Sequence, residues 1–508
     1  MALAAGALAL NRLLVGVFYD DGIYAGLAVS LARGTGYAHP HLPGTPHAVH
    51  YPPLYPLLLA PLFAALPLAG AAFAAKVANL VMAGAAAGIL AWHAERARLL
   101  GERAPRGLAA TVVAAGATAI PLLSVQAVLF SEPLFLLLLA VGVALADPPL
   151  PPLPRPGRWP PAAQSAAVGL VAALALLTRS IGLALGLGAA LFALLVRGDP
   201  WRRALLMLGP AAAAGLAWGA WVLLHRDGID PALALGYGSY AAHLEQAGWS
   251  ALAANVRELP RPLGALTLGW LPHPAVYIAV GLPALAVLLY GLALLARRSA
   301  AGLALCCYLG ILAAWPFFPD RFLWAVFPWL ALAWTAGTVA LLGRRALRVP
   351  LAVVAASVAI GYGSYQIRGF AGRWWEGAAR GVSRTFSDVL PAVRELPEDA
   401  VVATDDEALV WLYTGRLAVP LYIYSYRGRE TVEPSVEQHR AYLDRQGVTH
   451  ILLASPSSPA ARELRALIGA YPGWLAPVRS WPGGRWLFAV SASPLSPRER
   501  GTGGEDPP

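Results

Sequence analysis

Residues 71–93 read AAFAAKVANLVMAGAAAGILAWH, an apolar stretch interrupted by one lysine, Lys76. A helix of this length crosses the hydrocarbon core of a bilayer, which takes about 20 residues rising about 1.5 Å each. Comparable apolar runs occur throughout the first 366 residues, at 2–18, 108–128, 133–146, 163–177, 181–196, 204–224, 274–296, 300–316, 322–342 and 349–366. The sequence therefore predicts a polytopic α-helical membrane protein with about eleven membrane spans.

The composition fits this class of protein, because 58% of the residues are hydrophobic and only 13% are charged. The formal net charge of +10 would suit nucleic-acid binding, but the arginines concentrate in alternate connecting loops. Such an asymmetry is typical of cytoplasmic loops in membrane proteins. We therefore disfavour a nucleic-acid ligand. This orientation places the loop after the first apolar run, loop 225–273 and everything after about residue 366 outside the cytoplasm.

The chain changes character after its last apolar run. Short buried strands are predicted at 400–404 and 450–454, with helical stretches between and after them. Neither a glycine-rich dinucleotide motif nor a phosphate loop is present in this part of the sequence. We expect a transmembrane part at 1–366, with a first extracytoplasmic loop at 19–70, then a small extracytoplasmic α/β domain at 385–493 and a disordered Pro/Gly-rich tail at 494–508.

Two adjacent carboxylates, Asp20 and Asp21, directly follow the first apolar run. Ile23, Leu27 and Leu31 recur every four residues behind them, which predicts a short helix in the outer membrane interface. One interpretation is that an aspartate caps this helix. Adjacent residues lie about 100° apart on a helix, so both cannot aim at one atom. If one aspartate acts as a base, the other caps the helix or holds a cation.

The segment 50–56, HYPPLYP, opens a proline-broken apolar stretch that we interpret as an outer-leaflet hairpin. Tyr51 and Tyr55 are then candidate substrate contacts, and interfacial aromatic residues are the ordinary alternative. Four histidines crowd the same loop, and imidazoles suit a divalent metal ion. Their spacing matches no fixed ligand motif, so solvated loop histidines are the competing interpretation for His39, His41, His47 and His50.

Charged residues also interrupt apolar runs on the same outer side. Glu132, in SEPLF, is a carboxylate at a costly depth and thus a functional candidate, unless it caps the helix that opens at Pro133. Arg179 and Arg321 match phosphate oxygens in geometry, although arginines also reach out to lipid headgroups. Pairing with the neighbouring Asp320 is a further alternative for Arg321. Lys76, a cation near the outer start of its span, is a third candidate for binding the phosphate, after these arginines.

The carboxylates, the arginines and the aromatic proline-rich segment gather at the outer ends of several predicted helices. This is expected for a site that takes a charged lipid headgroup and catalyses its reaction outside the cytoplasm. In order along the chain, DDGIY, YPPLYP, SEPLF, TRS and DRFLWAVFPWL resemble motifs of the GT-C membrane glycosyltransferases. The nearest branch is the protein O-mannosyltransferase and aminoarabinose-transferase-like group, of family 39/83 type. The resemblance covers about residues 10–365.

The resemblance implies an enzyme of the bacterial cell envelope, a multi-pass protein of the inner (plasma) membrane. Its donor would be a polyprenyl-phosphate-linked hexose or pentose, and its acceptor a lipid, a glycan or a protein. The first acidic residue of the family's motif is the catalytic base and corresponds to Asp20; the second is usually glutamate and is Asp21 here. The family's lipid-phosphate contact corresponds to Arg321, and relatives often have lysine where Arg179 stands. Some relatives place a metal ligand where His50 stands.

An inverting transfer to a hydroxyl group needs one base, for which Asp20 is the candidate. The phosphate leaves as a stable anion, so no general acid is required, but its growing charge needs fixed donors or a metal ion. Arg321 and then Arg179 are the candidates. A lipid or solute transporter or flippase is the competing function. Transporters keep polar groups near the membrane midplane, whereas here they cluster at the outer ends of the spans, which favours the enzyme.

Overall fold

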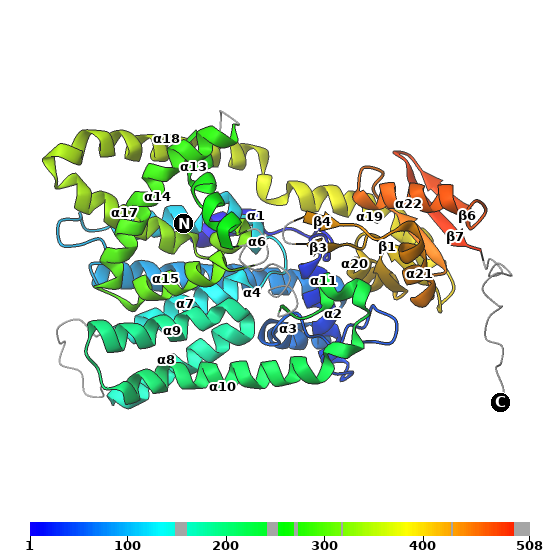
Figure 1. Ribbon diagram of the computed structural model, residues 1–508, viewed down its shortest axis with the longest axis horizontal. Helices are drawn as coiled ribbons and strands as arrows, with labels where there is room; N and C mark the ends of the chain where they lie inside the picture. Colours follow the sequence, from blue (N-terminus) through cyan, green and yellow to red (C-terminus); the bar gives the residue numbers. More distant parts are fainter. Residues whose placement is uncertain (148–159, 241–251, 269–272, 316–318, 428–429, 492–508) are drawn as a thin grey trace, which may run out of the picture.

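The computed structural model describes residues 1–147, 160–240, 252–268, 273–315, 319–427 and 430–491. A body of long helices occupies one end of the elongated molecule, and a smaller α/β unit occupies the other end (Figure 1). The tail predicted to be disordered at 494–508 lies outside the described residues.

The helical body consists of short and long helices that follow one another along the chain. Their bounds are α1 (Ala2–Ala9), α2 (Asp20–Ala32), α3 (Leu54–Ala65), α4 (Leu68–Arg96), α5 (Leu108–Ala117), α6 (Ile120–Gln126), α7 (Glu132–Ala146), α8 (Pro161–Thr178), α9 (Leu183–Leu191), α10 (Trp201–His225), α11 (Ala234–Tyr237), α13 (Pro260–Leu268), α14 (Pro274–Ala296), α15 (Ala300–Ala313), α16 (Asp320–Ala325), α17 (Phe327–Leu342) and α18 (Arg348–Gly372). Prolines at the first or second position open several of them, where the missing N–H costs nothing.

Five helices within the described residues are long and apolar enough to cross a membrane, namely α4, α8, α10 with its extension to Gly228, α14, and α18 with the turn before it. The pair α5 and α6 passes the same test together, although the two are bent by 56°. On α10 and α18 the side chains of Leu216, Leu224, Ile360 and Ile367 point outward, as expected of a lipid-facing surface. The predicted class, a polytopic helical membrane protein, is confirmed; the predicted number of about eleven spans stays a prediction.

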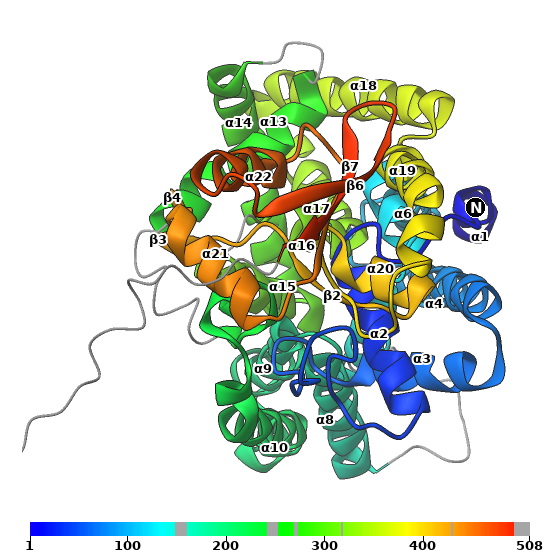
Figure 2. The ribbon, with the colours of Figure 1, turned by 90° about the vertical axis from the view of Figure 1, so that its right-hand side faces the viewer.

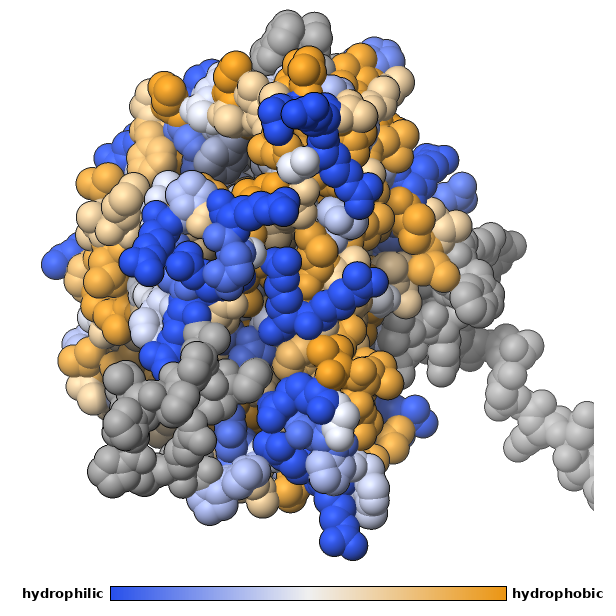
Figure 3. Space-filling view, turned by 90° about the vertical axis from the view of Figure 1, so that its left-hand side faces the viewer, coloured by the Kyte–Doolittle hydropathy of each residue, from blue (hydrophilic) through white to orange (hydrophobic). Residues whose placement is uncertain are grey.

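The arginine-rich loops lie at the end of the body that is remote from the α/β unit. These loops connect α4 to α5, α9 to α10, α14 to α15 and α17 to α18. Hydrophilic side chains spread across this end of the molecule (Figure 3). These arginine-rich loops therefore lie opposite the α/β unit, and the assignment of the two ends to the cytoplasm and the exterior stays a prediction.

The α/β unit follows α19 (Gly377–Arg394) and has a five-stranded sheet of order β2-β1-β5-β7-β6. Strand β1 pairs in parallel with β2 and β5, and β7 pairs antiparallel with β5 and β6. Strand β1 is buried along its whole length and β5 along most of it, as is usual for central parallel strands. The elements are β1 (Val401–Thr404), α20 (Glu407–Thr414), β2 (Leu417–Pro420), β3 (Ser425–Arg427), β4 (Glu430–Val432), α21 (Val436–Arg445), β5 (His450–Leu453), α22 (Pro459–Ala470), β6 (Leu475–Trp481) and β7 (Arg485–Val490).

Helix α20 joins the α/β unit to the body, because it packs directly on the start of α2 (Figure 2). A Cβ atom on Gly22 would lie 2.8 Å from the Cα of Gly16 and 3.0 Å from the Cβ of Ala408. Gly16 has a φ of 96°, which favours glycine, and a Cβ there would lie 2.6 Å from the Cβ of Leu409. The glycines on both sides of the acidic pair thus allow the two parts of the chain to approach closely.

Candidate functional site

A cavity of about 800 Å³ lies between helix ends of the body and the α/β unit. Its volume is in the range of small-molecule sites in proteins. Charged and aromatic side chains from distant parts of the sequence line it, among them Asp20, Tyr51, Arg179, Arg321, Asp406 and Tyr422.

Asp20 is the first residue of α2 and faces this cavity. Its Oδ1 accepts a hydrogen bond of 2.7 Å from the Tyr51 hydroxyl, and its Oδ2 lies 2.6 Å from Nη1 of Arg321. Burial alone would raise the pKa of Asp20, but Arg321 and the Tyr51 hydrogen bond lower it below its ordinary value. The carboxylate is therefore ionised at neutral pH and held from two sides.

The residue before Asp20 is held in an unusual conformation. Tyr19 has a φ of 60°, which non-glycine residues rarely adopt and which costs free energy wherever it occurs. Its ring stands edge-on to Tyr237 at 5.8 Å, and its hydroxyl lies over Gly236, where a Cβ would be only 2.1 Å away. This packing fixes the direction in which the chain enters α2, and with it the aim of Asp20.

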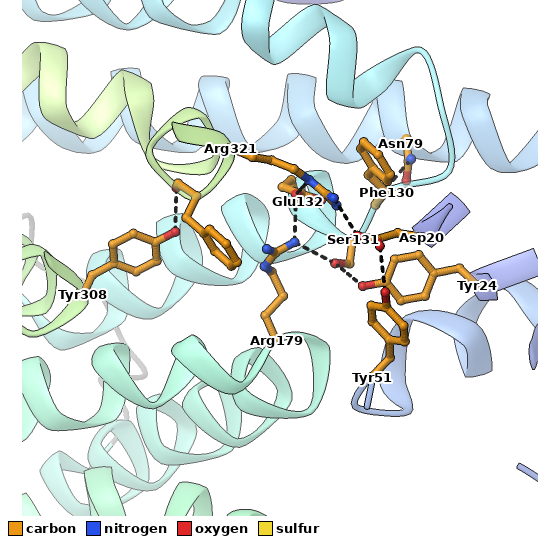
Figure 4. A network of polar contacts seen from close by, with 11 residues as sticks. Asp20, Tyr24, Tyr51, Asn79, Phe130, Ser131, Glu132, Arg179, Tyr308 and Arg321 are labelled. Atoms are coloured by element: carbon orange, nitrogen blue, oxygen red, sulfur yellow. Dashed lines mark hydrogen bonds and ion pairs between the residues drawn. The ribbon is translucent and has the colours of Figure 1, made fainter. Parts of the chain in front are cut away.

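A single buried carboxylate holds both arginines of the site (Figure 4). Oε1 of Glu132 lies 2.9 Å from Nε of Arg321 and 2.8 Å from Nη1 of Arg179, and the Glu132 side chain is fully buried. The ring of Phe130 lies 3.8 Å beneath the Arg321 guanidinium. Removing one partner from such a buried network would leave an uncompensated charge, so the four charged groups form one unit.

Two further polar residues tie the acidic helix to the arginines (Figure 4). The hydroxyl of Tyr24 lies 3.0 Å from Oγ of Ser131, which accepts a hydrogen bond of 3.2 Å from Nη1 of Arg179. Neither Tyr24 nor Ser131 was predicted from the sequence. A signal was present, because Tyr24 stands four residues after Asp20 on the same face of the helix, and Ser131 precedes Glu132 directly.

Asp21 and Lys76 lie away from the cavity. The Asp21 carboxylate is 1% exposed and accepts hydrogen bonds of 2.8 Å from the backbone N–H groups of Gly16 and Phe18. The Lys76 ammonium group donates to Oδ1 of Asn11 at 2.8 Å and to the carbonyl of Leu13 at 3.1 Å. Both residues hold the segment that leads into α2, and their expected roles as catalytic and phosphate-binding groups stay predictions.

The two tyrosines of the proline-rich segment lie in different surroundings. Tyr51 lines the cavity and bonds Asp20, whereas the hydroxyl of Tyr55 donates to Oδ1 of Asn79 at 3.0 Å in the protein interior. Both rings pack edge-on against Tyr24, at 5.0 Å each. Tyr51 is thus placed to meet a ligand, and Tyr55 supports the tyrosine cluster from behind.

The four loop histidines occupy three separate places. His39 and His41 are buried beside Tyr237, and His47 packs on His225 with ring centroids 4.4 Å apart. Nδ1 of His50 donates to the carbonyl oxygen of Gly238 at 2.7 Å. Among the residues that the structure describes, no three His, Cys, Asp or Glu side chains gather in a way that fits a metal ion. The role of His50 as a metal ligand stays a prediction without support from this arrangement.

The α/β unit contributes a second set of acidic groups that the sequence analysis did not identify. Asp405, Asp406 and Glu407 directly follow β1 and line the cavity. The hydroxyl of Tyr237 donates to Oε1 of Glu407 and lies 2.9 Å from Nε2 of His41. Burial raises the pKa of Glu407 to about 7. The available signal was a run of carboxylates just after a buried strand, where binding residues of α/β sheets commonly stand.

No family model matches the chain, and no curated protein matches its sequence. Solved structures do match. ArnT from Cupriavidus metallidurans in the apo state aligns over 97% of this chain and 98% of its own, at 14% identity and a TM-score of 0.54. The Archaeoglobus fulgidus oligosaccharyltransferase in the apo form aligns over 97% of this chain and 74% of its own, at 12% identity and a TM-score of 0.51. The same enzyme in complex with Zn and sulfate aligns over 96% of this chain and 73% of its own, at 13% identity and a TM-score of 0.50. At these identities the likeness is one of fold.

Proposed function

From the premise that the chain has the GT-C fold of membrane glycosyltransferases, as the sequence motifs predicted, we propose that it is an inverting glycosyltransferase. It moves a sugar from a polyprenyl-phosphate donor to an acceptor on the extracytoplasmic side of the plasma membrane. The observation that carries this proposal is the joint placement of Asp20, Arg321 and Arg179 on one cavity, with Glu132 behind both arginines.

Asp20 is the general base of this reaction. The acceptor hydroxyl gives its proton to a carboxylate oxygen of Asp20 while its oxygen forms a bond to the anomeric carbon of the donor sugar. The bond from that carbon to the phosphate oxygen breaks on the opposite face, so the configuration inverts. Polyprenyl phosphate departs with the electron pair as a stable anion, which makes a general acid unnecessary. Tyr51 keeps Asp20 oriented through its hydrogen bond of 2.7 Å.

Arg321 and Arg179 bind the donor phosphate. Their charges are balanced by Asp20 and Glu132 in the absence of donor, since the unit holds two cations and two anions. A bound phosphate competes with Asp20 for Arg321, because guanidinium groups bind phosphate oxygens through parallel hydrogen bonds. Donor binding thereby loosens the hold of Arg321 on Asp20 and makes the carboxylate a better base. The same guanidinium groups stabilise the charge that grows on the leaving phosphate.

The remaining predicted residues act indirectly, by holding other residues of the site in place. Glu132 fixes both arginines, Tyr55 supports the tyrosine cluster, and Asp21 and Lys76 hold the chain that enters α2. The described residues near His50 do not fit a metal ion, so no step is routed through one.

The test uses purified protein in lipid nanodiscs and a panel of radiolabelled polyprenyl-phosphate sugars, with membrane extract as the source of acceptor. The release of polyprenyl phosphate is followed for the wild type and for Asp20→Asn, with and without a chelator, which bears on the His50 prediction. Asp444→Asn is the control, because this aspartate is half-exposed on α21 and does not line the cavity. We expect release from one donor in the wild type and the control, and release slowed by about a thousandfold in Asp20→Asn. An absence of release from every donor would contradict the enzyme and favour a lipid flippase.

A further inference from the structure

The carboxyl ends of all three parallel strands of the α/β unit open onto the cavity. The chain leaves β1 for β2 on one side and reaches β5 on the other side, so β1 lies at the point where the strand order reverses. Open α/β sheets bind their ligands at this point, outside the carboxyl ends of the strands. The residues that follow these strands and line the cavity include Asp405, Asp406, Tyr422, Tyr424, Ser455 and Ser458.

Buried polar atoms at this edge lack partners within the described part of the chain. Oγ1 of Thr404 and Oε2 of Glu407 have no hydrogen bond there, although the two residues are 0% and 1% exposed. Oδ2 of Asp405 likewise has no hydrogen-bond partner among the described residues. Buried polar atoms are nearly always paired, because an unmade hydrogen bond at a buried position costs about 1–3 kcal/mol. All three residues line the cavity.

The ionisable side chains described at this edge are all acidic, whereas both arginines that line the cavity belong to the helical side. Asp405, Asp406 and Glu407 are consecutive, and burial together with the other two carboxylates raises the pKa of Asp406 well above its ordinary value. Burial also raises the pKa of Asp405 to about 6. The arginines of the site come from the helical body and are engaged by Asp20 and Glu132. An anionic donor phosphate therefore belongs on the helical side, because the described side chains of this edge offer an anion no cationic partner.

Aromatic rings complete this edge. Tyr422 and Tyr424 stack on each other with centroids 4.9 Å apart and an interplanar angle of 27°, and both line the cavity. Aromatic faces offer apolar contact area, while carboxylate oxygens accept hydrogen bonds from hydroxyl or ammonium groups. A sugar ring presents both features at once, an apolar face of C–H groups and a rim of hydroxyl groups.

We propose that the carboxyl edge of this sheet is the acceptor subsite and takes a saccharide whose recognised face carries hydroxyl or ammonium groups and neither phosphate nor carboxylate. The subsite is formed by Thr404, Asp405, Asp406, Glu407 and Tyr422. The inference deepens the proposed function, on which it rests for the assignment of this saccharide as the acceptor. Donor and acceptor then occupy one cavity, the donor on the side of the arginines and the acceptor on the side of the consecutive carboxyl groups.

The experiment measures ligand binding to the full-length protein in nanodiscs without donor, by isothermal titration calorimetry. The probes are maltotriose, the trimer of glucosamine, the trimer of galacturonic acid and trilysine. We expect the neutral and amino trimers to bind, and the acidic trimer to bind at least about tenfold more weakly. The variants Asp406→Asn and Tyr422→Ala should each weaken the glucosamine trimer about tenfold, which corresponds to about 1.4 kcal/mol. Asp444→Asn should leave its affinity unchanged, and Asp406→Glu should restore much of it if the fold is intact.

Three results would overturn the inference: no binding of any trimer, equal binding of the acidic trimer, or tighter binding of trilysine than of the glucosamine trimer. The measurement needs neither donor nor turnover. A protein that binds the amino trimer but releases no polyprenyl phosphate would therefore contradict the proposed function alone. A protein that releases polyprenyl phosphate but binds no trimer would contradict this inference alone.

Discussion

Oδ2 of Asp20 and Nη1 of Arg321 lie 2.6 Å apart, although 301 positions separate the two residues in the sequence. The contact joins the first residue of α2 to a short helix late in the body. It brings the proposed base and the proposed phosphate ligand together before any donor is bound. The pair therefore links donor binding to the basicity of Asp20.

Asp20→Asn should lower turnover by about a thousandfold, because general bases contribute about a hundred- to ten-thousandfold to rate and an amide cannot accept the proton. Donor binding should persist or tighten, since Arg321 loses its competitor for the phosphate. Single-turnover kinetics with separately measured donor affinity distinguishes the two effects. Turnover within tenfold of the wild type would refute the assignment of the base.

Arg321→Gln should raise the donor KM and lower kcat/KM by about ten- to a hundredfold, the loss expected for one charge-assisted hydrogen bond. Arg321→Lys should recover only part of this loss, because lysine lacks the planar fork that binds two phosphate oxygens. Donor titrations at saturating acceptor measure both variants. A donor KM equal to that of the wild type in Arg321→Gln would argue against a phosphate contact.

The pH dependence should report the lowered pKa of Asp20. Arg321 and Tyr51 favour the ionised carboxylate, so the active form persists on acidification until the pH falls below the ordinary aspartate range, about pH 4. Tyr51→Phe removes a hydrogen bond to the charged form, which raises the pKa and moves the acidic limb of kcat/KM to higher pH. The comparison of the two pH profiles is the measurement, and a limb that moves to lower pH in Tyr51→Phe contradicts the assignment.

Asp21→Asn should affect stability more than catalysis. The carboxylate accepts two backbone N–H groups, and an asparagine has only one oxygen for them, so one buried donor is left unpaired at a cost of about 1–3 kcal/mol. We expect a lower Tm in nanodiscs and a turnover per folded protein that falls less than tenfold. The opposite pattern, an unchanged Tm with a collapse of turnover like that of Asp20→Asn, would restore Asp21 as a catalytic group.

Gly22→Ala should disturb the junction between α2 and α20. The added Cβ would lie 2.8 Å from the Cα of Gly16, and backbone at that distance cannot move aside cheaply. We expect a lower Tm and reduced turnover, because the start of α2 carries Asp20. Gly88→Ala is the matched control, since a Cβ on Gly88 of α4 meets no atom within 4 Å. Equal behaviour of the two variants would show that the junction tolerates the change.

Several residues of the site were predictable because their signals are local. A carboxylate or a guanidinium beside an apolar run is costly, and this cost singled out Asp20, Glu132, Arg179 and Arg321 from the sequence alone. The structure places all four in one network (Figure 4). The same signal also selected Asp21 and Lys76, which are satisfied by neighbouring backbone or amide groups and lie away from the cavity. A charged residue at a membrane boundary needs an ionic or hydrogen-bonding partner. The sequence around it does not show which residue is that partner.

Hydropathy and the distribution of arginines were sufficient to establish a polytopic helical protein with an α/β unit after its last span, since both depend on residues close together in the chain. The sequence did not show which helix ends meet, because this depends on packing between elements hundreds of residues apart. That packing makes Glu132 the shared partner of two arginines, and it turns Asp20 toward the cavity while Asp21 faces the backbone. It also presses α20 onto α2, so that the carboxylates after β1 face the arginines of the body across one cavity.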